Sequence, residues 1–189
     1  MKVKKGGILF VFIIIMFNII GAALLYNHPA KKVIKKKPQI RVITTSEKQE
    51  STLTNWVYKH SNHCSLYTAR KIVKLSSNYK HRLWLLSLIA TESHFDTHAY
   101  SRTGAIGLGQ VMPFWIEELK ENNILQRKTD LWDAKSNIDA TKYILDKCLA
   151  KANGDFKKSL TYYFGKKSKH YTDKVYLNLG SLVVALNIN

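Results

Sequence analysis

The sequence predicts an all-α protein with one folded domain behind an apolar N-terminal segment. From about Leu53 onward, apolar residues recur with the period of a helix, and we find neither a convincing alternating strand pattern nor an internal repeat. A chain of 189 residues has room for one hydrophobic core and a short appendage. These observations predict a predominantly helical domain over residues 53–180.

Residues 1–27 have the pattern of a signal peptide or signal anchor. Three lysines precede an apolar run, residues 8–26, whose length is close to the ~20 residues needed to cross a bilayer. Small residues at 21–23 would allow signal-peptidase cleavage. The apolar run continues through Leu24, Leu25 and Tyr26, which favours a retained anchor slightly. Both interpretations stay open.

The formal net charge of +17 belongs largely to the region before the predicted domain. Residues 1–41 hold nine Lys and Arg and no acid, so residues 42–189 carry +8. We interpret residues 28–52, which contain Pro29 and Pro38, as a basic linker. A basic protein suits peptidoglycan, a membrane surface or nucleic acid. Nucleic acid is the weakest candidate, and no nucleic-acid partner is predicted, because the basic residues gather in the linker.

The apolar pattern predicts the helices of the domain in order. The first presents one apolar face, made by Leu66, Ala69, Ile72, Val73 and Leu75. The second, about residues 80–91, is apolar nearly all round and therefore central to the core. Pro113 can open the third, and the fourth runs from near Ser136 to Gly154. Asp155 can cap the fifth, and residues 171–179 form the last. The pattern gives no position for the apolar tail, residues 181–189.

Glu92 is the strongest candidate for chemistry, because it lies where the very apolar segment 83–90 ends. A carboxylate at the edge of an apolar helix is costly unless it is protonated, paired or used. Burial and the negative end of the helix dipole raise a carboxyl pKa toward neutrality, which a general acid needs. A glycine-rich turn, residues 104–110, follows. Its glycines would let backbone approach a ligand closely, and the amide of Gln110 offers a ligand both a donor and an acceptor.

The ordered set of motifs resembles the lytic transglycosylase family of the lysozyme-like superfamily, whose members cleave the glycan strands of bacterial cell walls. The matching elements, within about residues 66–179, are Glu92-Ser93, Phe95, Ala99, Ser101, the 104–110 turn, the segment 137–145, Thr161 to Gly165, and Tyr171, Lys174 and Val175. The resemblance implies a lysozyme-like single domain. No single element is specific, but their order is.

The resemblance also implies roles for individual residues. Glu92 becomes the catalytic acid, and Tyr162 matches the tyrosine that hydrogen-bonds it. The substrate-binding candidates are Ser93, Ser101, Gln110, Asn137 and Tyr162. The chain departs from the family where Gly109 replaces Met, Thr161 replaces Ala and Tyr163 replaces Asn. We expect Gly109 to remove a cleft side chain and Tyr163 an amide, which alters subsite preference before it abolishes activity.

The implied reaction is cleavage of the MurNAc–GlcNAc β-1,4 bond in peptidoglycan, with formation of 1,6-anhydro-MurNAc and without a cofactor. A hydrolytic lysozyme and a non-catalytic peptidoglycan-binding or scaffold component remain as alternatives. The expected partners are glycan strands, the membrane through the N-terminal segment, and proteins of a secretion or conjugation apparatus. The expected location is the cell envelope, on the periplasmic or extracytoplasmic face, with the chain anchored to the inner membrane or exported.

Three further groups complete the candidates. Asp96 is the nearest second carboxylate, and we interpret it as a cap or surface residue in the turn after Glu92. Cys64 and Cys148 could form one disulfide or stay as buried thiols, and the sequence leaves both open. His60, His63 and Cys64 have no further ligand nearby, so no metal site is predicted.

Overall fold

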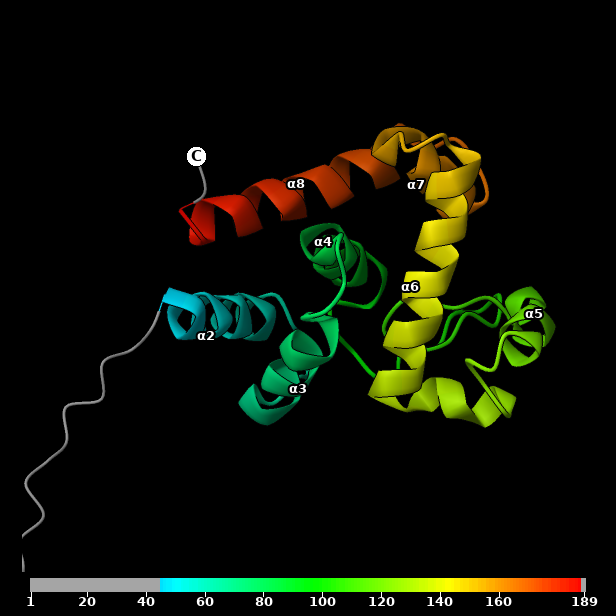
Figure 1. Cartoon of the computed structure of the whole chain (residues 1–189), viewed down its shortest axis with the longest axis horizontal. Helices are drawn as coiled ribbons and strands as arrows, with labels where there is room; N and C mark the ends of the chain where they lie inside the picture. The colour runs from blue at the N-terminus through cyan, green and yellow to red at the C-terminus, as the bar shows by residue number, and fades with distance from the viewer. Residues whose placement is uncertain (1–44, 188–189) are drawn as a thin grey trace, which may run out of the picture. The chain divides into compact units, whose positions relative to one another are not determined.

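The computed structural model describes residues 45–187, and this part of the chain is helical (Figure 1). Its elements are α2 (Thr45–Lys59), α3 (Leu66–Ser76), α4 (Arg82–Ser93), the 3-10 turn η1 (Pro113–Trp115), α5 (Ile116–Glu121), the 3-10 turn η2 (Lys128–Trp132), α6 (Ala134–Lys151), α7 (Phe156–Phe164) and α8 (Lys169–Ala185). Two isolated bridges, through Ile106, are the only β-type pairing within residues 45–187. The predicted all-α fold is confirmed.

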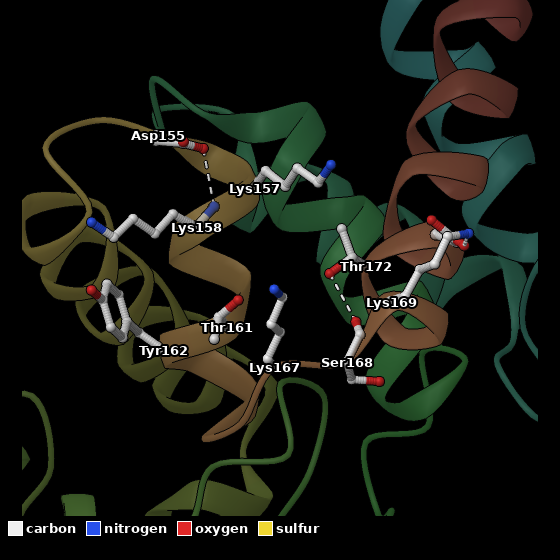
Figure 2. Close-up of a pocket in the computed structure, with 10 residues that line it drawn as sticks. Asp155, Lys157, Lys158, Thr161, Tyr162, Lys167, Ser168, Lys169 and Thr172 are labelled. Carbon is white, nitrogen blue, oxygen red and sulfur yellow. Dashed lines mark hydrogen bonds and ion pairs between the residues drawn. The ribbon is translucent and has the colours of Figure 1, made fainter.

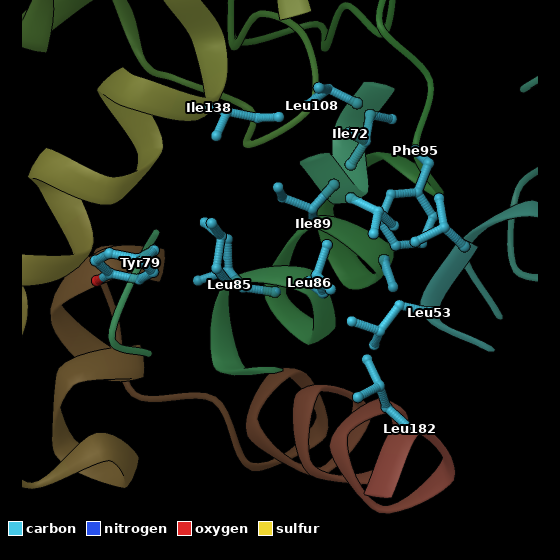
Figure 3. Close-up of a cluster of buried hydrophobic side chains, with 14 of the residues drawn as sticks. Leu53, Ile72, Tyr79, Leu85, Leu86, Ile89, Phe95, Leu108, Ile138 and Leu182 are labelled. Carbon is cyan, nitrogen blue, oxygen red and sulfur yellow. The ribbon is translucent and has the colours of Figure 1, made fainter. Parts of the chain in front are cut away.

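Helix α4 is the centre of the core, as its apolar sequence predicts. Four of its residues, Leu85, Leu86, Leu88 and Ile89, have at most 1% of their surface exposed. It packs against α8, which lies across it in Figure 1. Figure 3 shows the surrounding cluster, in which side chains from the other helices and from the loop after α4 meet those of α4. Because α4 is covered on all sides, its C-terminal end is held at a fixed place in the domain.

The helical domain extends beyond both predicted boundaries. Helix α2 begins at Thr45, inside the region predicted as linker, and buries Trp56 and Val57. Its first turns are polar because they face solvent, which hides the helical period from the sequence. One of these polar residues, Glu50, accepts two hydrogen bonds from the guanidinium of Arg82, at 2.5 and 2.9 Å. Residues 181–185 of the predicted tail likewise belong to α8, and Leu182 is fully buried in the core.

The N-terminal apolar segment, residues 8–26, lies outside the described residues, so its interpretation as anchor or signal peptide stays a prediction. Within residues 45–187, no helix combines the length and apolar character that a membrane crossing needs. The predicted basic linker up to residue 44 also lies outside the described part.

A second apolar cluster supports the segment that follows α4. Ile106, Val111, Leu119, Leu131 and Ile144 pack the glycine-rich turn, α5 and η2 onto one face of α6. The two clusters together fix the turn between α4 and α6. This arrangement brings residues 92–110 and 137–141 to one place.

The two cysteines are free thiols in this structure. Cys148 is buried in α6, and burial raises the pKa of its thiol to about 11. Cys64 lies in the segment between α2 and α3 and is partly exposed. Among residues 45–187, no group of three or more His, Cys, Asp or Glu side chains is arranged to hold a metal ion.

Candidate active site

Glu92 lies one residue before the end of α4, just before the chain reverses direction. His94 and Phe95 both have left-handed backbone conformations, with φ of 50° and 60°. Such conformations are strained for non-glycine residues, at a cost of about 1–3 kcal/mol each, unless packing holds them. Phe95 provides that packing, since its ring is 1% exposed and contacts Trp56 edge-on, with 5.9 Å between ring centroids. The reversal leaves Glu92 at the open end of the helix.

The carboxyl group of Glu92 is held by one hydrogen bond. The hydroxyl of Tyr171, from α8, donates to its Oε1 at 2.5 Å. Burial raises the pKa of Glu92 to about 7, and the hydrogen bond from Tyr171 opposes that rise. Oε2 has no hydrogen-bond partner among residues 45–187. Glu92 is therefore protonated in a substantial fraction of molecules near neutral pH, and one of its oxygens is open to a ligand.

Glu92 lines a cleft with a volume of about 490 Å³. One wall, which we call the glycine-loop wall, contributes Ser101, Thr103, Ala105, Gln110, Met112 and Phe114. The opposite part, which we call the α7–α8 wall, consists of Tyr163, Phe164, Gly165 and Lys166. Within the described residues, Glu92 is the only carboxylic acid that lines this cleft.

Backbone hydrogen bonds give the glycine-loop wall its shape. Ile106 and Val111 exchange two N–H···O bonds, at 3.1 and 3.0 Å, and Gly107 donates to Ala99 at 2.8 Å. Gln110 has a left-handed φ of 48°, and its Nε2 donates to the carbonyls of Ala99 and Gly107 at 3.2 and 3.1 Å. The amide nitrogen of Gln110 is thus used to hold the loop. Its Oε1 is the atom that remains available to a ligand.

Asn137 fixes this loop to α6 from beneath. Its Nδ2 donates to the carbonyls of Ile106 and Leu131 at 2.9 and 2.8 Å, and its Oδ1 accepts from the Gly109 N–H at 2.9 Å. The side chain is 1% exposed. The prediction that Asn137 binds substrate is therefore wrong. Asp133 is the N-cap of α6, and the buried amide of Asn137 is saturated by the loop that it holds.

Gly107 and Gly109 of the loop are needed for its close contact with α6. A Cβ at Gly107 would lie 2.2 Å from Nδ2 of Asn137, and a Cβ at Gly109 would lie 2.0 Å from Oγ1 of Thr141. The expectation that a side chain at 109 would line the cleft is therefore corrected, since it would point into α6. Gly107 also has a positive φ of 69°, which favours glycine.

Tyr162 does not contact the acid, so this prediction is wrong as well. The tyrosine that donates to Glu92 is Tyr171, on the helix that packs against α4. Consecutive residues of a helix point about 100° apart, and the residues of α7 that line the cleft are Tyr163 and Phe164. Tyr162 points elsewhere, and its ring lies under the ammonium group of Lys151, 4.5 Å from the centroid.

The remaining predicted residues divide between the cleft and its support. Ser101 lines the cleft, and its Oγ accepts from the Ala105 N–H at 2.9 Å. Ser93 does not line it, because its Oγ donates to the Leu108 carbonyl at 2.8 Å and so ties the loop to α4. Asp96 also lies outside the cleft, where its Oδ1 accepts from the His98 N–H at 2.8 Å and closes the turn. The roles of Glu92, Ser101 and Gln110 toward substrate stay predictions.

Two site residues were missed by the sequence analysis. Tyr171 was matched to a family motif without a role, and nothing local indicates that it reaches Glu92, seventy-nine positions earlier in the chain. Tyr163 was treated as the loss of an amide. In the structure its hydroxyl donates to the Gly109 carbonyl at 2.7 Å, and the negative charge of Glu92 helps burial to raise its pKa well above the ordinary value. Gly109 and Tyr163, two residues that depart from the family pattern, thus contact each other.

The helical domain, with Glu92 in a cleft at the end of its central helix, is consistent with the lysozyme-like fold that the sequence motifs imply. Residues 72–175 match the family model of the transglycosylase SLT domain, which covers more than half of the chain. The chain therefore belongs to this family of peptidoglycan lytic transglycosylases. No curated protein and no solved structure matches it.

Proposed function

We propose that Glu92 is the single acid and base of a lytic transglycosylase that cleaves the MurNAc–GlcNAc β-1,4 bond and releases 1,6-anhydro-MurNAc. The observation that carries this proposal is the carboxyl group of Glu92 in the cleft, with its pKa raised to about 7 and no second carboxyl beside it among the described residues. A glycosidase that uses water requires a base or nucleophile on the far side of the sugar. A reaction in which the substrate supplies its own nucleophile does not.

The first step uses the protonated form of Glu92. Tyr171 donates to Oε1, which favours the acidic proton on Oε2. Glu92 transfers this proton to the glycosidic oxygen as the bond from that oxygen to C1 of MurNAc breaks, and positive charge develops at C1. A pKa close to the working pH suits this transfer, because much of the enzyme then carries the proton.

The second step uses the carboxylate that the first step leaves. Glu92 removes the proton from the C6 hydroxyl of the same MurNAc residue, and the C6 oxygen bonds to C1. Glu92 recovers its proton, and no water is consumed. Because the nucleophile belongs to the substrate, the step has the entropic advantage of an intramolecular reaction.

Product analysis tests the proposal. The full-length chain is incubated with purified peptidoglycan, and the products are separated and weighed by mass spectrometry. We expect products lighter by one water than those of hydrolysis. We expect Glu92→Gln to lower the rate by about 10³-fold, because it removes the proton donor while it keeps the shape.

Asp96→Asn is the matched control, since it removes the neighbouring carboxylate but keeps the oxygen that closes the turn. This variant should cleave at the wild-type rate. Products with an ordinary reducing end would instead indicate a lysozyme. Normal binding to glycan without any cleavage by the wild-type chain would indicate a non-catalytic scaffold.

We further propose that the enzyme acts in the cell envelope, outside the cytoplasm, on the periplasmic or extracytoplasmic face. The apolar run at residues 8–26 supports this, and so does a substrate that lies outside the cytoplasm. Amino-terminal sequencing of the protein from the membrane fraction and from the soluble extracytoplasmic fraction tests the two forms of the proposal. An intact N-terminus supports an anchor, and a new N-terminus after residues 21–23 supports an exported protein. We propose that the protein, whether anchored or exported, works as part of a secretion or conjugation apparatus.

A further inference from the structure

A second hollow lies between the walls formed by α7 and α8 and has a volume of about 580 Å³ (Figure 2). We call it the basic pocket, and its defining residues are Lys157, Lys158, Thr161, Tyr162, Lys167 and Lys169. None of these residues takes part in the proposed reaction. The pocket therefore needs a separate explanation.

The basic pocket and the cleft are adjacent. Residues 161–162 and 167–169 line the pocket, whereas the residues between them, 163–166, line the cleft. The connection between α7 and α8 is thus a shared wall, with Lys166 in the cleft and Lys167 in the pocket. A branched ligand that occupies the cleft can extend a side branch past this wall.

Three lysines of the pocket have no acidic partner. The carboxylate of Asp155 caps α7 by accepting from the Lys158 backbone N–H at 3.0 Å, and the carboxylate of Asp173 pairs with Lys169 at 2.7 Å. Within residues 45–187, this leaves the ammonium groups of Lys157, Lys158 and Lys167 unpaired. In Figure 2 the side chain of Lys167 lies between the ribbons of α7 and α8.

The position of these charges opposes folding. Lys157 and Lys158 lie in the first turn of α7 and Lys169 in that of α8, and neither turn contains an acid after its cap. The positive end of a helix dipole disfavours cations there. Repulsion among the positively charged ammonium groups adds to the free-energy cost of placing them there. An anion in the pocket would relieve both effects, and the Thr161 hydroxyl, which has no hydrogen-bond partner among the described residues, could donate to it.

The chemistry of the proposed substrate identifies the anion. Each MurNAc residue of a glycan strand can carry a short peptide stem that branches from the sugar, and these stems end in carboxylates. Ammonium groups and hydroxyls are donors that bind carboxylates through charge-assisted hydrogen bonds. We propose that the basic pocket binds the carboxylates of a peptide stem on the strand held in the cleft, so that the enzyme prefers stem-bearing strands. This inference rests on the proposed function.

The test compares two substrates and two variants of the full-length chain. The substrates are glycan strands with intact stems and the same strands after an amidase has removed the stems, both stripped of wall phosphodiester polymers. Amidase treatment leaves one carboxylate on each lactyl group, so the strands stay anionic. The pocket variant carries Lys157→Gln, Lys158→Gln and Lys167→Gln. The control variant carries Lys59→Gln, Lys74→Gln and Lys128→Gln, three exposed lysines that line neither hollow.

We expect wild type to cleave stem-bearing strands with a kcat/KM about tenfold above that for stem-free strands, the size expected from two or three partly exposed charge pairs. The control variant should keep this preference. The pocket variant should lose it through a higher KM, with kcat unchanged.

Two results would overturn the inference while the proposed function stands. One is that wild type cleaves both substrates equally well. The other is that kcat/KM of the pocket variant falls by the same factor on both substrates, which would indicate that the lysines attract any anionic strand. A preference that appears only before the phosphodiester polymers are stripped would assign the pocket to phosphate instead of carboxylate, and would also overturn it. Failure of the proposed function would look different, because neither substrate would then yield anhydro products.

Discussion

The glycine-loop wall and the α7–α8 wall of the cleft differ in how closely each is packed. On the glycine-loop wall, an added Cβ at Gly109 would lie 2.0 Å from Thr141, whereas an added Cβ at Gly165 on the opposite wall would meet nothing within 4 Å. The side chain of Asn137 satisfies the buried Gly109 N–H and the Ile106 carbonyl beneath the glycine-loop wall. The α7–α8 wall ends in an exposed lysine, Lys166.

If the proposed function holds, the two walls would divide the work between them. The proposed proton transfer from Glu92 depends on a fixed position of the substrate, and tight packing of the glycine loop on α6 can provide it. The proposed recognition of the branches of a strand requires charge and space, which the α7–α8 wall and the basic pocket offer. Tyr163 connects the two walls of the cleft. It lies on the α7–α8 wall, and its hydroxyl donates to the Gly109 carbonyl of the glycine loop.

The largest effect on stability is expected from Asn137→Ala. This change leaves the Gly109 N–H and the Leu131 carbonyl without partners in the buried base of the loop, while the Ile106 carbonyl keeps only its bond from the Val111 N–H. The loss should lower the free energy of unfolding by about 3 kcal/mol. Urea unfolding followed by circular dichroism measures it. Asn178→Ala is the control, because its Nδ2 makes one hydrogen bond, to Thr91 Oγ1, and should cost about 1 kcal/mol. Equal losses for the two variants would contradict a special role for Asn137.

Alanine substitutions at the two glycines compare the walls directly. Gly109→Ala should cost about 2 kcal/mol, because its Cβ collides with Thr141. Gly165→Ala should cost about 1 kcal/mol, since its φ of 80° is strained for alanine but its surroundings are open. Thr141→Ala removes the two closest clashing atoms, so Gly109→Ala should cost less in that background. Purely additive losses in this double-mutant cycle would show that Thr141 is not the cause.

The sequence predicts the parts of this site that depend on local pattern. Helix α4 follows from its apolar residues, and Glu92 stands out because an acid ends that apolar segment. The partner of the acid could not be predicted in this way. Tyr162 and Tyr171 are both aromatic residues of helices, and the one that reaches Glu92 is decided by the packing of α8 on α4. The contact of Gly109 with Thr141 is also set by tertiary packing.

The smallest effect, a shift in pH dependence, is expected from Tyr171→Phe. In the proposed reaction Glu92 acts first as an acid, so kcat/KM should fall as pH rises through its pKa, about 7 in the wild type. The hydroxyl of Tyr171 stabilises the charged carboxylate and so lowers the pKa that burial alone would produce. Its removal should raise the pKa of Glu92, and the decline in activity should move to higher pH.

A kcat/KM profile from pH 5 to pH 9 measures this shift. Tyr176→Phe is the matched control, because it makes the same chemical change on the same helix at a residue that packs against Trp84 and lies outside the cleft. Its profile should coincide with that of the wild type. A Tyr171→Phe profile that moved to lower pH would mean that the hydroxyl favours the protonated acid. A uniform loss of rate without a shift would mean that Tyr171 positions Glu92 but does not tune it. In the second case the tuning of the acid would have to come from burial alone, and the α8 side of the site would contribute to catalysis only through its shape.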